Sequence, residues 1–204
     1  MVETNNNPRK KHLQTFNAPG VKVLLTLVLI VVLGVACLTG AAYAGTIELP
    51  KTGQTTTYAT GDDGAIQAGV AWPSPRFTAA TNTVTDNLTG LMWTKDANLA
   101  GTVTWQGALD YVTSMNTGAG TYGYTDWRLP NINELESLVN AEQANPATWL
   151  NSQGFTNVQS LYYWSSTSFA DSTSGAWFVY MGVGFVHANV KSYGLYVWPV
   201  RSGQ

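Results

Sequence analysis

Cysteine and histidine are scarce in this chain of 204 residues, which has one Cys and two His. The cysteine, Cys37, lies in an N-terminal apolar segment, so the rest of the chain can form no disulfide even in an oxidising compartment. A zinc site needs several Cys or His ligands, and His187 is the only histidine after that segment. We therefore expect no metal, no redox chemistry and no cofactor.

Charged residues are also few, at 11% of the chain. Residues 1–44 hold four of the 10 Lys and Arg residues and one of the 12 Asp and Glu residues, which leaves six basic and eleven acidic residues, a net charge of −5, in the remainder. An acidic domain has no electrostatic footprint for nucleic acid, so we expect no nucleic-acid partner. All 8 Trp lie in the same remainder, and an aromatic core can supply stability without disulfides.

The first 44 residues have the pattern of a secretory signal. Basic residues precede an apolar run from Val23 to Leu38, and small residues follow up to Ala42-Tyr43-Ala44, a small-x-small cleavage pattern. The run is short for a membrane span, which needs about 20 residues, although counting to Ala44 would just suffice. We expect residues 1–44 to be a signal peptide, with an uncleaved anchor as the alternative. The mature protein would then be secreted, periplasmic or cell-surface, and would contact the membrane only through an uncleaved segment.

Residues 45–75 are rich in Gly, Thr and Pro and have no long apolar period. This composition is typical of a lead-in tether, with one docked stretch expected around Val70–Trp72. Asp62-Asp63-Gly64 could suggest calcium, but the alternating ligands and terminal Glu of an EF-hand loop do not follow. A surface turn is the better interpretation.

The next segment predicts a hairpin and two helices. Residues 81–86 and 91–95 flank the turn sequence Asn-Leu-Thr-Gly, which favours a β-hairpin. A helix should begin near Trp105 with Thr104 as its N-cap. A second helix should follow Pro130, with Asn131 as its N-cap and Glu134 completing a capping box.

The last third of the chain changes to short aromatic and β-branched runs separated by turn compositions. Four such runs, LYYWSSTSF, AWFVYM, FVHANV and LYVWPVR, predict a meander of four antiparallel strands. The expected fold class is therefore α+β, with a front hairpin, two helices and a small antiparallel sheet that ends in this C-terminal meander.

The motif TDWRLPNINELE raises the question of what Arg128 does. It lies between Trp127 and Leu129, which we expect in the core, so its guanidinium needs acceptors. Asp126, Glu134 or carbonyls of the C-terminal strands could supply them. We interpret Arg128 as a structural clasp rather than a ligand clamp. The structural motif is Trp127, Arg128, Pro130 and Glu134.

Ligand-binding candidates are the aromatic and polar residues at predicted strand ends and turns. Lys191 and Tyr193 fall in a turn, which has no core to fill. By contrast, we expect Trp164, Trp177 and Phe178 in the core. The candidate ligand-binding residues are Asp171, Tyr180, His187, Lys191 and Tyr193.

The sequence gives only weak evidence for a set of catalytic residues. A Ser-His-Asp triad could be written from Ser165 or Ser166 with His187 and Asp126, but no nucleophile elbow surrounds the serines. Serines inside a strand are expected to bond neighbouring backbone instead. No Asp/Glu pair marks a glycosidase site. We therefore expect no catalytic residues.

Six motifs occur in the order found in a known family: VTDNLTGLMWTKDAN, WQGALDYV, YGYTDWRLPNINELESLV, YWSST, AWFV and VWPVR. On these motifs residues 76–204 resemble the Lcl C-terminal domain family and are distantly similar to the C-type-lectin-like and formylglycine-generating group. The resemblance implies a C-type-lectin-like fold, trimer formation and binding to sulfated glycans. The collagen repeats of the namesake adhesin are absent, because the chain has no Gly-X-Y run. The copper chemistry of formylglycine generation is not expected without a cysteine pair.

These observations favour an exported, non-catalytic binding or adhesion module of the bacterial cell envelope. Its expected partner is an extracellular glycan or a surface protein, and a homo-oligomer is in keeping with the resemblance. The alternative is a cell-envelope enzyme, acting on carbohydrate or sulfate esters, whose site the sequence does not reveal.

Overall fold

The computed structural model describes residues 49–203, which belong to a single compact unit. The predicted signal peptide and its cleavage position lie outside the described residues. Within residues 49–203, no helix is long and apolar enough to cross a membrane. The described helices are α2 (Asp63–Ile66), α3 (Trp105–Ser114), α4 (Ile132–Glu136) and α5 (Pro146–Ser152).

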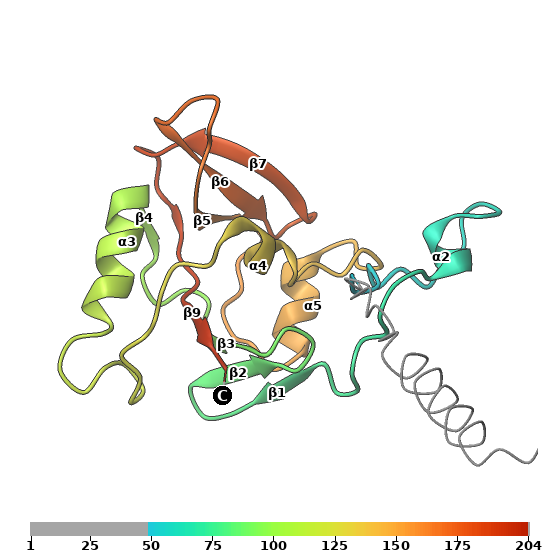
Figure 1. Ribbon diagram of the computed structural model, residues 1–204, viewed down its shortest axis with the longest axis horizontal. Helices are drawn as coiled ribbons and strands as arrows, with labels where there is room; N and C mark the ends of the chain where they lie inside the picture. The colour runs from blue at the N-terminus through green and yellow to red at the C-terminus, as the bar shows by residue number, and fades with distance from the viewer. Residues whose placement is uncertain (1–48, 204) are drawn as a thin grey trace, which may run out of the picture. The chain divides into compact units, whose positions relative to one another are not determined.

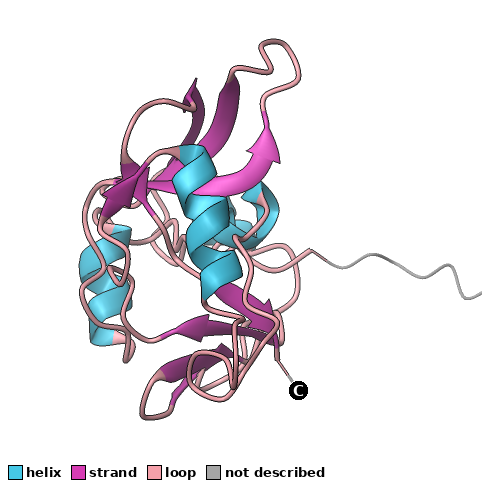
Figure 2. Ribbon diagram, turned by 90° about the vertical axis from the view of Figure 1, so that its left-hand side faces the viewer, coloured by secondary structure: helices cyan, strands magenta, loops and turns pink. Residues whose placement is uncertain are grey.

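Two sheets lie at opposite ends of the domain, with α3 and α5 between them (Figures 1 and 2). The four-stranded sheet has the order β1-β2-β3-β9 and is antiparallel throughout. Its strands are β1 (Phe77–Ala79), β2 (Thr83–Asp86), β3 (Leu91–Thr94) and β9 (Val200–Ser202). The β2–β3 pair is the hairpin that the sequence predicts. Mixed helices and mainly antiparallel strands confirm the α+β class.

The five-stranded sheet has the order β4-β8-β5-β6-β7. Its strands are β4 (Thr102–Val103), β5 (Tyr162–Ser168), β6 (Gly175–Tyr180), β7 (Phe185–Val190) and β8 (Leu195–Tyr196). The β5-β6-β7 part is the predicted antiparallel meander. Strand β7 forms one edge of the sheet.

The fourth run of the predicted meander behaves differently. Strand β8 pairs with β5 in parallel and with β4 antiparallel, and the chain then leaves this sheet so that β9 joins β3 in the other. Residues 197–199 separate the two strands, and Pro199 among them has no N–H to donate to a ladder. The Pro199 carbonyl instead accepts a hydrogen bond from the Thr94 N–H, at 3.1 Å. The prediction of one small sheet was therefore wrong.

Both predicted helices are present with their caps. The Thr104 hydroxyl accepts from the Gly107 N–H at 3.2 Å, and Asn131 and Glu134 form the complete capping box. The count of two was wrong, because α5 and the one-turn α2 also form. Helix α5 is capped by Asn145 and has Pro146 in its first turn, a good helix start. Its seven residues are too few to display a clear 3.6-residue period.

A core rich in Trp and other aromatics joins both sheets and α5. Trp93 and Trp198 pack edge to face with ring centroids 5.6 Å apart, and Phe155 packs against Trp198 at 5.0 Å. A second apolar cluster lies between α3 and the five-stranded sheet, around Trp164. Trp127 and Trp164 are buried, as predicted.

The lead-in segment, residues 49–75, has more contacts than the tether interpretation allows. The Trp72 indole donates to the Lys51 carbonyl at 2.8 Å, and the Ala141 N–H donates to the Thr52 carbonyl at 3.0 Å. The Glu142 carboxylate accepts from the backbone N–H groups of residues 55 and 56, at 2.7 and 3.0 Å. The Trp72 bond holds the segment to itself, and the bonds of Ala141 and Glu142 fasten it to the domain. Of the three residues expected in a surface turn, Asp62 caps α2 through its carboxylate, whereas Asp63 and Gly64 begin this helix and Gly64 is buried.

Candidate functional site

The Arg128 motif makes a forked ion pair. Arg128 Nη1 and Nη2 each lie 2.6 Å from a different carboxylate oxygen of Glu134, one of the expected acceptors. The backbone of Arg128 also exchanges two hydrogen bonds with Val200, at 2.9 and 3.0 Å. Burial raises the pKa of Glu134, but hydrogen bonds from Arg128 and from the Asn131 N–H outweigh it and leave this pKa below its ordinary value. The motif therefore joins the start of α4 to β9.

Arg128 is partly buried, as the sequence suggested, and 42% of its side chain remains exposed. The better-buried arginines are two that the sequence did not single out. Arg201 Nε donates to Asp126 at 2.6 Å, which removes Asp126 from the acceptors expected for Arg128. Arg76 pairs with Asp86 at 3.2 Å, and both side chains are almost fully buried. All three arginines thus pair with carboxylates of the same domain.

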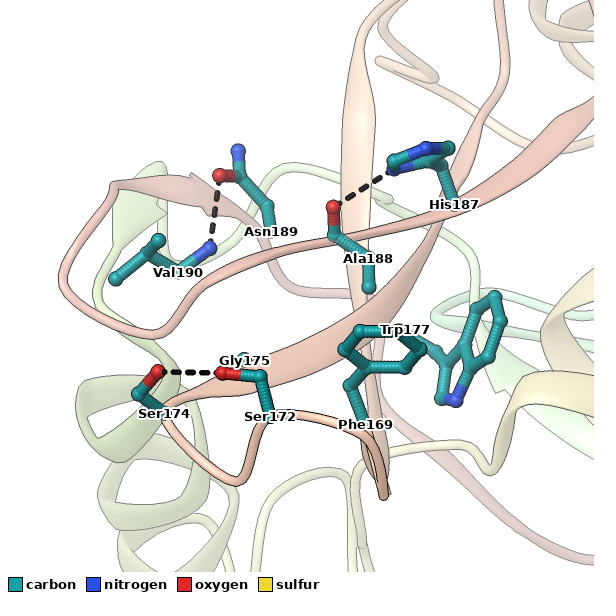
Figure 3. A pocket seen from close by; sticks show the side chains of 9 residues that line it. All are labelled: Phe169, Ser172, Ser174, Gly175, Trp177, His187, Ala188, Asn189 and Val190. Atoms are coloured by element: carbon teal, nitrogen blue, oxygen red, sulfur yellow. Dashed lines mark hydrogen bonds between the residues drawn. The ribbon is translucent and has the colours of Figure 1, made fainter.

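A hollow of about 310 Å³ opens between the loop of residues 169–174 and strands β6 and β7 (Figure 3). Phe169 and Trp177 form one side, with their rings edge to face and their centroids 5.2 Å apart. Ala188 and Val190 of β7 contribute the facing aliphatic groups. We call this cavity the Trp177 hollow. Its lining is mainly apolar.

The polar groups of the Trp177 hollow are uncharged. Ser172 and Ser174 lie at one end, with their hydroxyl oxygens 3.0 Å apart. The Trp177 indole N–H has no hydrogen-bond partner among residues 49–203, whereas five other indoles donate to backbone carbonyls. Because Trp177 is only half-buried, its ring and its N–H both remain accessible.

Two residues of β7 border the hollow through their backbone alone. Side chains alternate along a strand, so His187 and Asn189 point to the opposite face from Ala188 (Figure 3). His187 Nδ1 lies 2.8 Å from the Ala188 carbonyl oxygen and donates to it, while Asn189 Oδ1 accepts from the Val190 N–H at 2.8 Å. The predicted site residue His187 therefore presents no imidazole to the hollow.

The other face of the β6–β7 hairpin carries a cluster of aromatic rings. Phe178 is its buried centre, with the Tyr162 ring at 5.1 Å and the His187 ring at 6.1 Å. Phe185 packs against Tyr180 with centroids 5.4 Å apart. The structure thus places candidates Tyr180 and His187 together, but away from the hollow.

The remaining candidates occupy three different environments. Asp171 is exposed on the hollow's loop. Lys191 Nζ donates to the Ser168 hydroxyl at 2.8 Å and to the Thr173 carbonyl at 3.0 Å, so Lys191 ties this loop to the end of β7. Tyr193 is 60% exposed in the turn before β8, outside the hollow's lining.

Sequence reasoning missed Trp177. We expected it in the core with Trp164 and Phe178, and the structure confirms only those two. In the run AWFVYM both faces of the strand carry large side chains, so alternation could not show which face was open. The polar loop ADSTSG beside this strand was the available signal.

The residues of the conjectured triad lie in unrelated environments. Ser165 is buried, and its hydroxyl donates to the Trp177 carbonyl at 2.8 Å, the backbone bond expected for a strand serine. His187 bonds its own strand, and Asp126 pairs with Arg201. Within residues 49–203, no group of three or more His, Cys, Asp and Glu side chains could hold a metal ion.

The geometry defines an α+β domain that has two sheets, three arginine–carboxylate pairs and an open aromatic hollow. The model of the Lcl C-terminal domain family matches residues 82–201, more than half of the chain. The protein belongs to the Lcl C-terminal domain family. No curated protein matches the chain.

Proposed function

We propose that this protein is an exported, non-catalytic binding module of the bacterial cell envelope, and that the Trp177 hollow takes a sugar ring of an extracellular glycan. The observation that carries the proposal is the half-buried Trp177, whose ring and N–H are both open to a ligand. Ligand sites are mostly apolar concavities with a few placed polar groups, of about 300–1,000 Å³. The hollow, at about 310 Å³, suits one ring.

The groups in the hollow match the two kinds of surface on a sugar. The C–H face of a pyranose is apolar and packs on an aromatic ring such as Trp177 or Phe169. Sugar hydroxyls both donate and accept, as do the hydroxyls of Ser172 and Ser174, and the indole N–H adds a donor. One small cavity thus offers a stacking surface and hydrogen-bond partners.

The loop that closes the hollow is held in place before any ligand arrives. Its two ends are joined by a hydrogen bond from the Phe169 N–H to the Gly175 carbonyl, at 3.0 Å. A Cβ at position 175 would lie 3.2 Å from the Asn189 carbonyl oxygen, so glycine allows the close approach to β7. Lys191 adds its two bonds to the same loop. A preformed site loses less entropy on binding, which favours affinity.

The export half of the proposal is supported by the signal pattern of residues 1–44. We also propose a C-type-lectin-like arrangement for residues 76–204, with the lead-in fastened to it through Glu142. A homotrimer, which the family resemblance implies, belongs to the same proposal. Size measurement of the exported protein tests it.

A glycan array probed with the exported protein tests the binding role. Truncating a central aromatic contact costs about 2 kcal/mol or more, roughly a 30-fold loss of affinity. Trp177→Ala should therefore lose the array signal, at a melting temperature that shows it is folded. The matched control is Tyr193→Ala, which removes an exposed aromatic outside the hollow and should bind like the wild type. If Trp177→Ala binds the glycan as well as Tyr193→Ala does, the glycan binds at another surface.

A further inference from the structure

We infer that the glycan of the Trp177 hollow is uncharged, and that the hollow excludes sulfated and carboxylated sugars. This inference rests on the proposed function and narrows its ligand. Between Tyr162 and Val190, the stretch that builds the hollow, the only Asp, Glu, Lys or Arg is Asp171. That one carboxylate is exposed on the hollow's own loop. An anionic ligand would therefore approach a fixed negative charge.

The nearest lysine in sequence already has partners. Lys191 Nζ bonds Ser168 and Thr173 and lies 4.0 Å from the centroid of the Trp105 ring. To bind a sulfate it would have to leave these contacts, and the loop would lose its tie to β7. Sulfate recognition in proteins relies on Arg forks or free ammonium groups. Among the described residues that line the hollow, none is Arg or Lys.

Backbone N–H groups are the other common receptor for oxyanions. Around the hollow several are already paired within the protein. The Gly175 N–H donates to the Ser172 carbonyl at 2.8 Å, and the Lys191 N–H donates to the Ser174 carbonyl at 2.9 Å. The Val190 N–H donates to Asn189 Oδ1. What the hollow offers instead is two hydroxyls and one indole N–H, which suit neutral hydroxyl or acetamido groups.

The charge of the whole domain acts in the same direction. Residues after position 44 carry a net charge of −5, and such a field slows the approach of an anionic polymer. A neutral ligand is unaffected by this field. Its affinity should consequently be almost independent of ionic strength, since salt screens only charges.

The test follows the indole resonances of the ¹⁵N-labelled exported protein by NMR. The Trp177 resonance is identified by its loss in Trp177→Phe. The probes are cellotetraose and chitotetraose, which are neutral, and a heparin-derived tetrasaccharide, which is sulfated. We expect a neutral probe to shift the Trp177 resonance, with an affinity that changes less than about twofold between about 0.05 and 0.5 M NaCl. We expect the sulfated probe to leave that resonance in place.

The remaining outcomes distinguish the proposed glycan site from the inference that its ligand is uncharged. A Trp177 shift caused by the sulfated tetrasaccharide would overturn the charge inference and leave the hollow as a glycan site. If the neutral probes shift other indole resonances but not that of Trp177, the proposed site is overturned, and the charge inference with it. If no probe shifts any indole resonance, both ideas fail for these sugars.

Discussion

Removing Arg76 should be among the most damaging single changes in this domain. Arg76 Nε and Nη2 donate to the Asp86 carboxylate at 3.3 and 3.2 Å, and both side chains are almost fully buried. Without Arg76, the donors that remain to the Asp86 carboxylate within residues 49–203 are the Leu88 N–H and the Thr89 hydroxyl, at 3.0 and 3.1 Å. Leaving a buried charge unpaired costs about 3–5 kcal/mol. The guanidinium also lies 4.1 Å from the Trp72 ring centroid, and that stacking would be lost too.

Urea unfolding measures this loss directly. With a slope of about 2 kcal/mol/M, a loss of about 4 kcal/mol lowers the midpoint of Arg76→Ala by about 2 M. Arg76→Lys should be nearly as damaging, because an ammonium cannot supply two donors from a planar fork. A midpoint that falls by less than about 0.5 M would refute the reasoning, since a buried, unpaired Asp86 cannot be that cheap.

A double variant separates charge from packing. Replacing both members of a buried pair with apolar residues is often neutral or stabilising. Arg76→Met combined with Asp86→Leu should therefore recover much of the midpoint lost in Arg76→Ala. If the double variant is as unstable as the single one, the arginine contributes through its contacts with Trp72 and Phe77 rather than by neutralising Asp86.

Four further predictions follow from the fold and the leader. Arg128→Ala and Arg128→Lys should each lower the free energy of unfolding by about 1–2 kcal/mol, less than Arg76→Ala does, because the Arg128–Glu134 pair is half-exposed. A normal melting curve with lost glycan binding would instead make Arg128 a ligand-binding residue. Trp127→Ala should cost about 3–5 kcal/mol, since the ring is buried and its N–H bonds the Thr121 carbonyl; an unchanged denaturation midpoint would place the ring on the surface. Hydrogen bonds from Thr56 and Thr55 lower the pKa of Glu142 to about 2. The tie that Glu142 makes to the lead-in is therefore fully present above the ordinary pKa of about 4.5 and is lost as pH falls through about 2. The amide shifts of residues 55 and 56 should follow this loss, and Glu142→Gln should abolish the pH dependence. The intact mass of the exported protein should correspond to a start near Gly45, whereas retention of residues 1–44 would indicate an anchored form.

Local rules predicted those parts of the fold that neighbouring residues determine. The caps at Thr104 and Asn131 and the hairpin around residues 87–90 depend on residues within four positions of each other, and all three are present. Arg128 and Glu134 are six positions apart, and Glu134 was one of the acceptors that the sequence analysis named for Arg128. Short-range chemistry was therefore sufficient for these elements.

Long-range pairing could not be predicted in the same way. Arg201 pairs with Asp126 across 75 positions, and β8 pairs with β4 and β5, from which it is separated in sequence by the rest of the meander. The site shows the same limit. Trp177 borders the hollow because the 169–174 loop stops short of covering it, and no periodicity in its own strand records where a neighbouring loop ends.

Two hydrogen bonds within β7 protect the exposed edge of the five-stranded sheet. The Lys191–Ser174 bond continues the β6–β7 ladder, so by alternation the backbone groups of Ala188 and Val190 face outward from the sheet edge. An open edge invites strand-to-strand aggregation. Here the His187 ring already occupies the Ala188 carbonyl, and the Asn189 amide oxygen occupies the Val190 N–H. A neighbouring chain that approaches this edge therefore finds the Ala188 carbonyl and the Val190 N–H already hydrogen-bonded within β7.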